Sequence, residues 1–451
     1  MDQPTSSTET GTISAEVGKL LEQTPIDAAE QLLQFAQFNR DDFGALELEI
    51  SNFVGASRWA HATQQWTLLI DYATTLDELL ERRGYWHNRH TLLNWAQEAT
   101  QNLQLNDLGV RIYLALGVMA SKWGQWNEAL SYYSKAQQIA EAVTEEILSA
   151  EVRSNIAAIY LQTGRWAEAI DYYQGALDIF ERLGEEERAA TVCDNLGLAH
   201  AYEGDLGKAE ELMARGLAYS EKRSNKLGMA TTYANLAGVY ARQERWQEAI
   251  QYYRQALEVQ QEREDLHTVS QITANLGMVH TGAGQPQLAV KLYRIALNLM
   301  QRLNDLPGLA ALENNLGLLF AQTGQYHEAI AYYQQSLTLC ERLGDVYGVA
   351  MASGNLGNIY AEQGIAEEAM KSYQQARDAM ERIGDIQGLA RTYHNLGVLL
   401  HQQGRSEEGT TLSQQALALF EQLELPEADK VRQWLTAVQT ELAYRKEHDN
   451  H

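Results

Sequence analysis

The feature that most constrains this chain is a repeat of 40 residues. An Asn-Leu-Gly triplet, or a near variant of it, begins at seven positions, each 40 residues after the last. These positions are Asn155, Asn195, Asn235, Asn275, Asn315, Asn355 and Asn395. A period of this length indicates a repeat architecture, in which each unit buries its apolar face against the next. The period therefore predicts an array of similar units rather than independent globular domains.

Other residues keep the same register and divide each unit into two helices. A glycine follows nine residues after most of the asparagines, as at Gly324, and supplies the left-handed turn that ends a helix. An alanine follows fourteen residues after and a tyrosine eighteen residues after, as Ala329 and Tyr333 show. Small residues let two helix backbones approach closely, and the large tyrosine fills the space beside them. Each unit is thus predicted to be a helix-turn-helix hairpin.

The register can be followed outward from the strict repeats, with more exceptions toward the N-terminus. We predict an all-α solenoid of about nine stacked hairpins over residues 66–423, followed by a C-terminal capping helix and tail over residues 424–451. Residues 1–12 are expected to be a disordered tail, and residues 13–65 a helical N-terminal cap. The apolar face of this cap is marked by Ile26, Ala29, Leu32, Leu33 and Ala36. An alternative is that the segment folds back into the groove of the array as an autoinhibitor.

The segment Asn155–Leu177 resembles the tetratricopeptide repeat, with Ile156 and Ala157 in place of Leu-Gly. The usual repeat has about 34 residues, and the longer form with an inward asparagine is similar to the repeats of the Pins family and of kinesin light chains. We expect the extra length to come from second helices that continue through the sequence E-R-L-G-D, as at Glu341–Asp345. The resemblance implies a right-handed α-solenoid whose concave groove holds peptide partners.

The repeated asparagine is the one feature that points to a binding site. Asparagine is mildly unfavourable within a helix, because its side chain competes for backbone hydrogen bonds. Helical geometry places it away from the hairpin core, on one face with the residues three positions later, among them Leu198, Met278, Leu318 and Asn358. A carboxamide can both donate and accept, so we predict that the seven asparagines and these four residues bind a peptide. An alternative is that each asparagine bonds to the neighbouring hairpin and only sets the pitch of the array.

Composition narrows the class of partner. The formal net charge is −25, from 60 acidic and 35 basic residues, which disfavours nucleic acid and anionic membrane surfaces and favours a partner with a basic segment. Cys193 and Cys340 make no disulfide or metal pattern. We find neither a signal peptide nor a run of about 18 apolar residues, so no membrane insertion and a cytoplasmic location are expected.

No catalytic motif accompanies the repeat. The sequence has no phosphate-binding loop, no dinucleotide-binding glycine pattern and no H-E-x-x-H. We therefore expect a non-enzymatic scaffold or adaptor without cofactor or metal, such as an assembly factor, that holds a peptide or protein segment in its groove. The alternative is a regulatory protein that senses a peptide or effector and changes shape on binding. The oligomeric state stays open.

Overall fold

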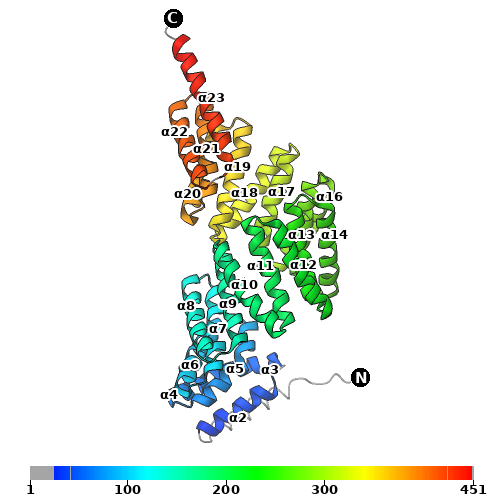
Figure 1. Cartoon of the computed structure of the whole chain (residues 1–451), viewed down its shortest axis with the longest axis vertical. Coiled ribbons are helices and arrows are strands. Elements are labelled where there is room, and N and C mark those ends of the chain that lie inside the picture. Colours follow the sequence, from blue (N-terminus) through cyan, green and yellow to red (C-terminus); the bar gives the residue numbers. More distant parts are fainter. Residues whose placement is uncertain (1–24, 41, 424, 449–451) are drawn as a thin grey trace, which may run out of the picture. The chain divides into compact units, whose positions relative to one another are not determined.

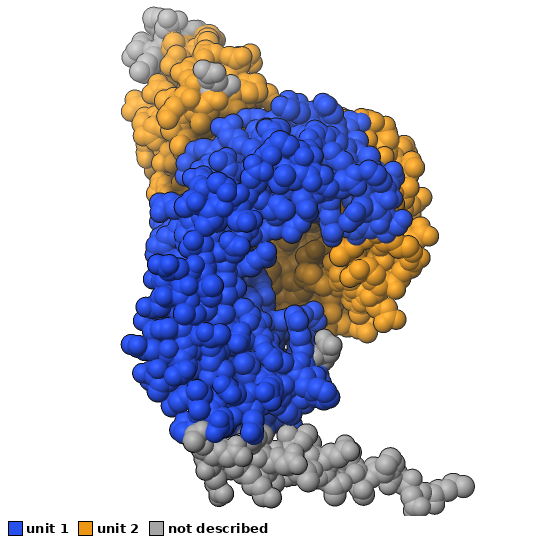
Figure 2. Space-filling view, turned by 60° about the horizontal axis from the view of Figure 1, so that its bottom comes forward, with its two compact units in different colours: residues 1–225 blue, residues 226–451 orange. Residues whose placement is uncertain are grey.

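Paired helices make up the chain in the computed structural model, which describes residues 25–40, 42–423 and 425–448 (Figure 1). The described residues form 22 helices and divide into two compact units, residues 1–225 and residues 226–451 (Figure 2). From α5 onward, each odd-numbered helix packs against the even-numbered helix that follows it. These pairs are nine stacked helix-turn-helix hairpins, as the 40-residue period predicts.

Unit 1 contains the helices that precede residue 226. They are α2 (Pro25–Phe38), α3 (Phe43–Leu48), α4 (Ile50–Ala62), α5 (Trp66–Arg82), α6 (Trp86–Leu103), α7 (Asn106–Lys122), α8 (Trp126–Ala142), α9 (Glu146–Gln162), α10 (Trp166–Leu183), α11 (Glu186–Glu203) and α12 (Leu206–Lys222).

Unit 2 contains the strictest repeats. Its helices are α13 (Lys226–Arg242), α14 (Trp246–Glu262), α15 (Leu266–Gly282), α16 (Pro286–Leu303), α17 (Leu306–Gln322), α18 (Tyr326–Leu343), α19 (Val346–Glu362), α20 (Ala366–Ile383), α21 (Ile386–Gln402), α22 (Ser406–Gln422) and α23 (Glu427–His448). The last of these packs against α22 through buried Val431, Leu435 and Val438.

A left-handed residue ends the first helix of each hairpin. Gly324 has a φ of 75°, and the next N–H, that of Gln325, donates to the carbonyl of Phe320 at 2.9 Å. This bond from the third residue beyond the helix closes the last turn and satisfies a carbonyl that the helix leaves free. The glycine of the repeat is therefore needed because an L-residue with a Cβ pays a steric cost in this conformation.

Glu244 occupies the same turn position without being a glycine, and its φ is 59°. We expect Glu244→Gly to raise the free energy of unfolding by about 0.5–1 kcal/mol, since removing the Cβ relieves more strain than the added chain entropy costs. Urea unfolding would measure this gain. The opposite change at a matching turn, Gly364→Ala, should lower stability by about 1 kcal/mol. A loss of stability in Glu244→Gly would contradict this account of the turn.

A close approach of two helices forms the core of most hairpins. A Cβ built on Gly317 would lie 2.6 Å from Cδ1 of Tyr333, which is only 1% exposed. The same contact joins Gly277 to Tyr293 and Gly357 to Tyr373. The Gly–Tyr pairs of the sequence are thus direct neighbours, and the ring takes the space that the missing side chain leaves.

The α5–α6 hairpin is built differently at this point. The residues in register with the small pair of other hairpins are Asp77 and Arg89. The Arg89 side chain is only 4% exposed, and its Nε and Nη2 donate to the two carboxylate oxygens of Asp77 at 2.7 and 2.9 Å. Glu81 adds a second carboxylate at 3.1 Å. A buried arginine paired with a half-buried aspartate therefore stands where other hairpins bring two backbones together.

Two details of the sequence-based picture are wrong. The second helices do not continue through E-R-L-G-D: α18 ends at Leu343, Gly344 is left-handed with a φ of 69°, and the Asp345 side chain accepts from the N–H of Gly348 to cap α19. Glycine stops one helix and aspartate starts the next, because each supplies what a helix end lacks. In α2, Ala29, Leu32, Leu33 and Ala36 are buried as expected, but Ile26 is 37% exposed.

The disordered tail predicted for residues 1–12, and the part of the cap before Pro25, lie outside the described residues. The described part of the cap is α2, α3 and α4, which pack on α5. Whether this segment caps the array or enters a groove stays a prediction.

Candidate peptide-binding site

All seven asparagines of the repeat lie on odd-numbered helices, and all point away from the hairpin core. Asn155 and Asn195 belong to unit 1, and the other five belong to unit 2. The leucine that follows Asn355 is only 3% exposed, whereas Asn275 is exposed and the other six asparagines are half-buried. The helical repeat thus buries one residue of the motif and leaves its neighbour at the surface.

Two of these asparagines bond to the neighbouring hairpin. Nδ2 of Asn355 in α19 donates to Oδ1 of Asn314 in α17 at 3.1 Å, and Nδ2 of Asn395 in α21 donates to Oδ1 of Asn358 in α19 at 3.0 Å. Asn155 instead donates to the carbonyl of Glu151 within its own helix. A contribution of asparagine to the stacking of hairpins is therefore seen at Asn355 and Asn395.

The remaining asparagines behave differently. Their carboxamides have no hydrogen-bond partner within residues 25–40, 42–423 and 425–448. They are Asn195, Asn235, Asn275 and Asn315. Stacking alone does not explain a polar side chain at these four positions.

A pocket of about 330 Å³ opens on the asparagine face of unit 2, between α19, α20 and α21. It brings together three of the predicted site residues, Asn355, Asn358 and Asn395. The rest of its lining is Tyr347, Ala350, Met351, Gly354, Tyr373, Met380, Asp385, Gln387, Gly388, Arg391 and Thr392. We call this the α19–α21 pocket.

One buried tyrosine helps to orient two of the three carboxamides in the α19–α21 pocket. Tyr373 is 3% exposed, and its hydroxyl donates to Oδ1 of Asn358 at 2.8 Å. Burial raises the pKa of Tyr373 well above its usual range, so the phenol keeps its proton and remains a donor. Oδ1 of Asn358 thus accepts from both Tyr373 and Asn395, which fixes the orientation of its amide.

This network leaves hydrogen-bonding capacity unused. The N–H groups of Asn358 and the Oδ1 atoms of Asn355 and Asn395 have no partner in the described part of the chain. Donors and acceptors that are held in place but not consumed match the alternating N–H and C=O groups of an extended backbone.

Exposed apolar side chains flank these amides. Tyr347 is 59% exposed and Met351 is 38% exposed, both on α19. Met278 and Leu318, which the sequence predicts for this face, are 44% and 41% exposed on the neighbouring helices α15 and α17. Leu198 is half-buried and lies in unit 1, so it is not part of this pocket. Sequence reasoning missed Tyr347, although its place one turn before Met351 was a usable signal.

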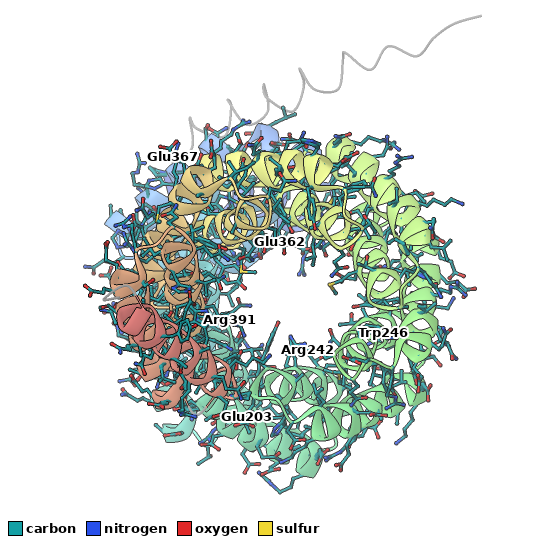
Figure 3. The ribbon with its side chains drawn as sticks, turned by 90° about the horizontal axis from the view of Figure 1, so that it is seen from above. Glu203, Arg242, Trp246, Glu362, Glu367 and Arg391 are labelled. Carbon is teal, nitrogen blue, oxygen red and sulfur yellow. The ribbon has the colours of Figure 1, made fainter. Side chains whose placement is uncertain are left out.

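The charges on this face are of both signs. Glu362 and Arg391 point to the inner side of the curved row of unit 2 helices, whereas Glu367 of α20 points outward (Figure 3). Nη2 of Arg391 lies 2.9 Å from Oε1 of Glu427, the first residue of α23, and this hydrogen bond lowers the pKa of Glu427. The positive charge of Arg391 is thus paired with Glu427, whereas the Glu362 carboxylate is exposed on this face.

Other chemistry is sparse in the described residues. They contain no group of three or more His, Cys, Asp and Glu side chains placed to hold a metal ion. Cys193 and Cys340 are both buried and unpaired with each other, and burial raises the pKa of the Cys193 thiol to about 12. Within the same residues, every helix is too short or too polar to cross a membrane.

The repeat matches a known protein family. A family model described as tetratricopeptide repeat matches five stretches, residues 147–222, 228–302, 268–342, 308–382 and 348–422. Together they cover more than half of the chain. No curated protein matches the sequence.

Solved structures share the fold at low identity. A Rap protein complexed with competence and sporulation factor is 16% identical, with 79% of this chain and 98% of that chain covered and a TM-score of 0.55. The Rap conjugation gene regulator of a plasmid, in complex with the Phr* peptide, is 17% identical, with coverage of 75% and 96% and a TM-score of 0.54. Aspartyl phosphate phosphatase F from Bacillus subtilis is 12% identical, with coverage of 79% and 94% and a TM-score of 0.50. At these identities the likeness concerns the fold alone.

Proposed function

The chain belongs to the tetratricopeptide repeat family, and from this premise we propose that it is a non-catalytic adaptor that holds an extended segment of another protein against the asparagine face of unit 2. Tetratricopeptide repeats are protein-binding scaffolds. Beyond this general role, we propose where the partner binds, which conformation its bound segment has and which side chains recognise it.

The α19–α21 pocket is the observation that carries this proposal. Three carboxamides from two helices converge there with unused donors and acceptors. Tyr373 and Asn395 both donate to Asn358, and Asn355 is held by its bond to Asn314. Carboxamides neither transfer protons nor attack substrates near neutral pH, so the group is suited to holding a backbone rather than to catalysis. Tyr347 and Met351 offer apolar contact to one side chain of the bound segment.

The charge of the chain favours a particular kind of segment. With a net charge of −25 and the exposed Glu362 on the inner side, a basic segment is attracted over distances of about a Debye length. We therefore propose a partner whose bound segment is extended, carries Lys or Arg, and places one apolar side chain against Met351.

Removing two of the three carboxamides tests the proposal. We expect Asn355→Ala combined with Asn395→Ala to weaken binding about ten-fold, since each lost hydrogen bond contributes roughly 0.5–1.5 kcal/mol. The measurement is the affinity of peptides that are selected on the full chain from a random library. Asn298→Ala, an exposed asparagine on α16, is the matched control and should bind normally. Equal affinity for the double variant and the control would refute the asparagine face as the site.

A sensor is the second candidate function. One of the two Rap structures is a complex with competence and sporulation factor, and the other is a complex with the Phr* peptide. Each hairpin of a repeat array contacts only its neighbours, so such arrays change curvature easily. Under this proposal, a selected peptide changes the radius of gyration of the full chain in small-angle scattering. A scattering profile that stays the same at saturating peptide favours the adaptor instead.

A further inference from the structure

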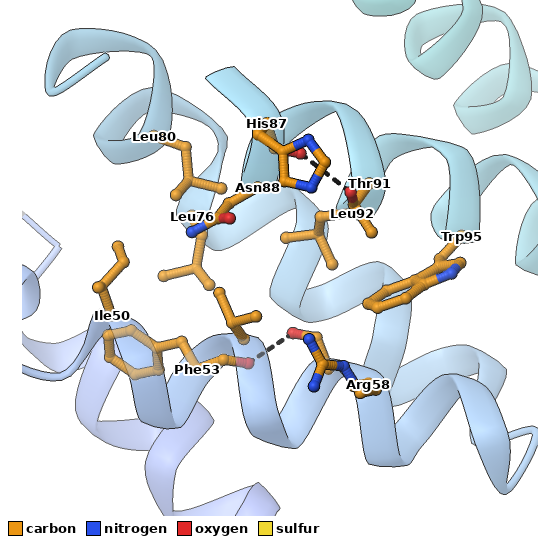
Figure 4. Close-up of a pocket in the computed structure, with 12 residues that line it drawn as sticks. Ile50, Phe53, Arg58, Leu76, Leu80, His87, Asn88, Thr91, Leu92 and Trp95 are labelled. Atoms are coloured by element: carbon orange, nitrogen blue, oxygen red, sulfur yellow. Dashed lines mark hydrogen bonds between the residues drawn. The ribbon is translucent and has the colours of Figure 1, made fainter. Parts of the chain in front are cut away.

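A second pocket lies in unit 1 and is lined by residues of α4, α5 and α6 (Figure 4). Its volume is about 110 Å³. It contains none of the residues of the asparagine face, so it is a separate feature of the molecule. We call it the α4–α6 pocket.

The floor of this pocket is apolar. Phe53, Leu76 and Leu92 line it, and their exposed fractions are 0%, 1% and 6%. A cavity of about 150 Å³ with such a lining takes up benzene. At about 110 Å³ the α4–α6 pocket is smaller than that cavity, so it is suited to one apolar group no larger than an isobutyl or phenyl group.

The rim carries unused hydrogen-bond donors. The side chains of Arg58, His87 and Asn88 have no hydrogen-bond or ion-pair partner in residues 25–40, 42–423 and 425–448. His87 and Asn88 also lie in the first turn of α6, where backbone N–H groups point out of the helix end and favour negative charge. Arg58 comes from α4, on the far side of the pocket from Leu80 (Figure 4).

The charge of this pocket is opposite to that of the chain. No aspartate or glutamate lines it, although the chain has 60 acidic residues. Two other pockets in the described residues are each lined by at least one carboxylate, Asp71 in one and Asp385 in the other. A cation and donors above an apolar floor, without a competing acid, are complementary to a carboxylate joined to an apolar group.

The hairpin that contributes α5 and α6 to this pocket departs from the repeat at one point. Asp77 and Arg89 form an ion pair there, where other hairpins carry two small residues. The leucine at position 92 is ordinary by comparison, because three other hairpins carry Leu212, Leu292 and Leu412 in the same register.

We propose that the α4–α6 pocket binds a small carboxylic acid whose carboxylate bonds to Arg58 at the rim and whose branched aliphatic or phenyl group enters the apolar floor. This site makes the chain responsive to a small metabolite at a place apart from the peptide-binding face. It does not depend on the function proposed above, because it uses other helices and another unit.

Binding of isocaproate and phenylacetate to the full chain tests the proposal, with ligand-observed NMR as the readout. We expect saturable binding with a Kd of about 1 mM or below, as is usual for ligands of this size. Arg58→Gln should weaken it about five- to ten-fold, because a charge-assisted bond is lost. The matched control is Arg111→Gln, an exposed arginine of α7 outside the pocket, which should bind normally. Leu92→Tyr fills the floor and should abolish binding, with circular dichroism to confirm folding.

Each remaining outcome overturns the proposal. A carboxylate site here is excluded if neither acid shows saturable binding. It is also excluded if the neutral amides isocaproamide and phenylacetamide bind as tightly as the acids, or if Arg58→Gln and Arg111→Gln have equal effects on binding. An acetylated, amidated Leu-Asp dipeptide that binds while both free acids do not would assign the pocket to a polypeptide side chain instead.

Discussion

Replacing Tyr333 with alanine is expected to lower the free energy of unfolding of unit 2 by about 3–5 kcal/mol. The ring is 1% exposed and fills the space between α17 and α18 at the point of closest approach. Its loss removes the transfer free energy of an aromatic side chain and leaves a cavity that two rigid helices cannot close. Urea unfolding of the full chain, followed by circular dichroism, measures the change.

A double-mutant cycle with Gly317 shows whether the two residues share one space. Gly317→Leu alone should also cost about 3 kcal/mol or more, since its Cβ would lie 2.6 Å from the Tyr333 ring. In the double variant the leucine enters the space of the missing ring, so the combined cost should fall short of the sum by at least about 2 kcal/mol.

An exposed tyrosine of the same unit is the control for this cycle. Tyr347 is 59% exposed, and Tyr347→Ala should change stability by no more than about 0.5 kcal/mol. If the losses in the free energy of unfolding for Gly317→Leu and Tyr333→Ala are additive, the glycine and the tyrosine ring do not share one space.

The stability of unit 2 is expected to fall as pH rises from about 4.5 to about 7, through Glu313 in α17. Burial raises the pKa of this carboxyl from its usual 4.5 to about 7, and its Oε2 is buried without a hydrogen-bond partner in the described residues. Over this range the folded chain retains a proton that the unfolded chain has released, so unfolding becomes easier as pH increases. Above pH 7 both states are ionised, and the full cost of the buried charge remains.

Glu313→Gln removes this titration while keeping the shape of the side chain. A shift of this size corresponds to roughly 3 kcal/mol for a fully buried group, and solvent screening of the half-buried Glu313 reduces our expectation to about 1–2 kcal/mol. The variant should therefore be more stable than the parent at pH 8, and the two should converge toward pH 4.5. Urea midpoints at a series of pH values measure this difference.

Glu258→Gln provides the comparison, because Glu258 is an exposed carboxylate in the middle of α14. It should shift the midpoint equally at all pH values in this range, or not at all. If the stability of the parent chain instead rises between pH 5 and pH 7, and Glu313→Gln follows the same curve, Glu313 does not control the pH dependence of unfolding.

Much of the fold was accessible from the sequence because the 40-residue period repeats the same physical requirements. Gly324 and its equivalents ended helices, and the Gly–Tyr pairs met in space, since glycine and a large ring satisfy the same local geometry in every unit. The tetratricopeptide resemblance of Asn155–Leu177 was confirmed. The sequence E-R-L-G-D predicts a continuous helix, and this prediction is wrong. Its glycine, Gly344, is left-handed and ends α18, and its aspartate caps α19.

The binding face was predictable only in outline. Helical periodicity placed the asparagines outward, and the structure gathers Asn355, Asn358 and Asn395 around one pocket. It could not show that Asn358 accepts from Tyr373, since that bond depends on the distance between α19 and α20. Residues that depart from the repeat, such as Glu313 and Arg89, have properties that a consensus sequence does not predict.

Because the hairpins that begin with α15, α17, α19 and α21 each contain their own start and stop signals, this part of the chain is exchangeable in steps of 40 residues. Asp265, Asp305, Asp345 and Asp385 each cap the helix that opens a unit, and a left-handed residue closes the helix before it. A gene segment that is duplicated or deleted in register joins one complete stop signal to one complete start signal, so neighbouring units keep their geometry. Recombination can therefore alter how many asparagines face a partner without redesigning any single hairpin.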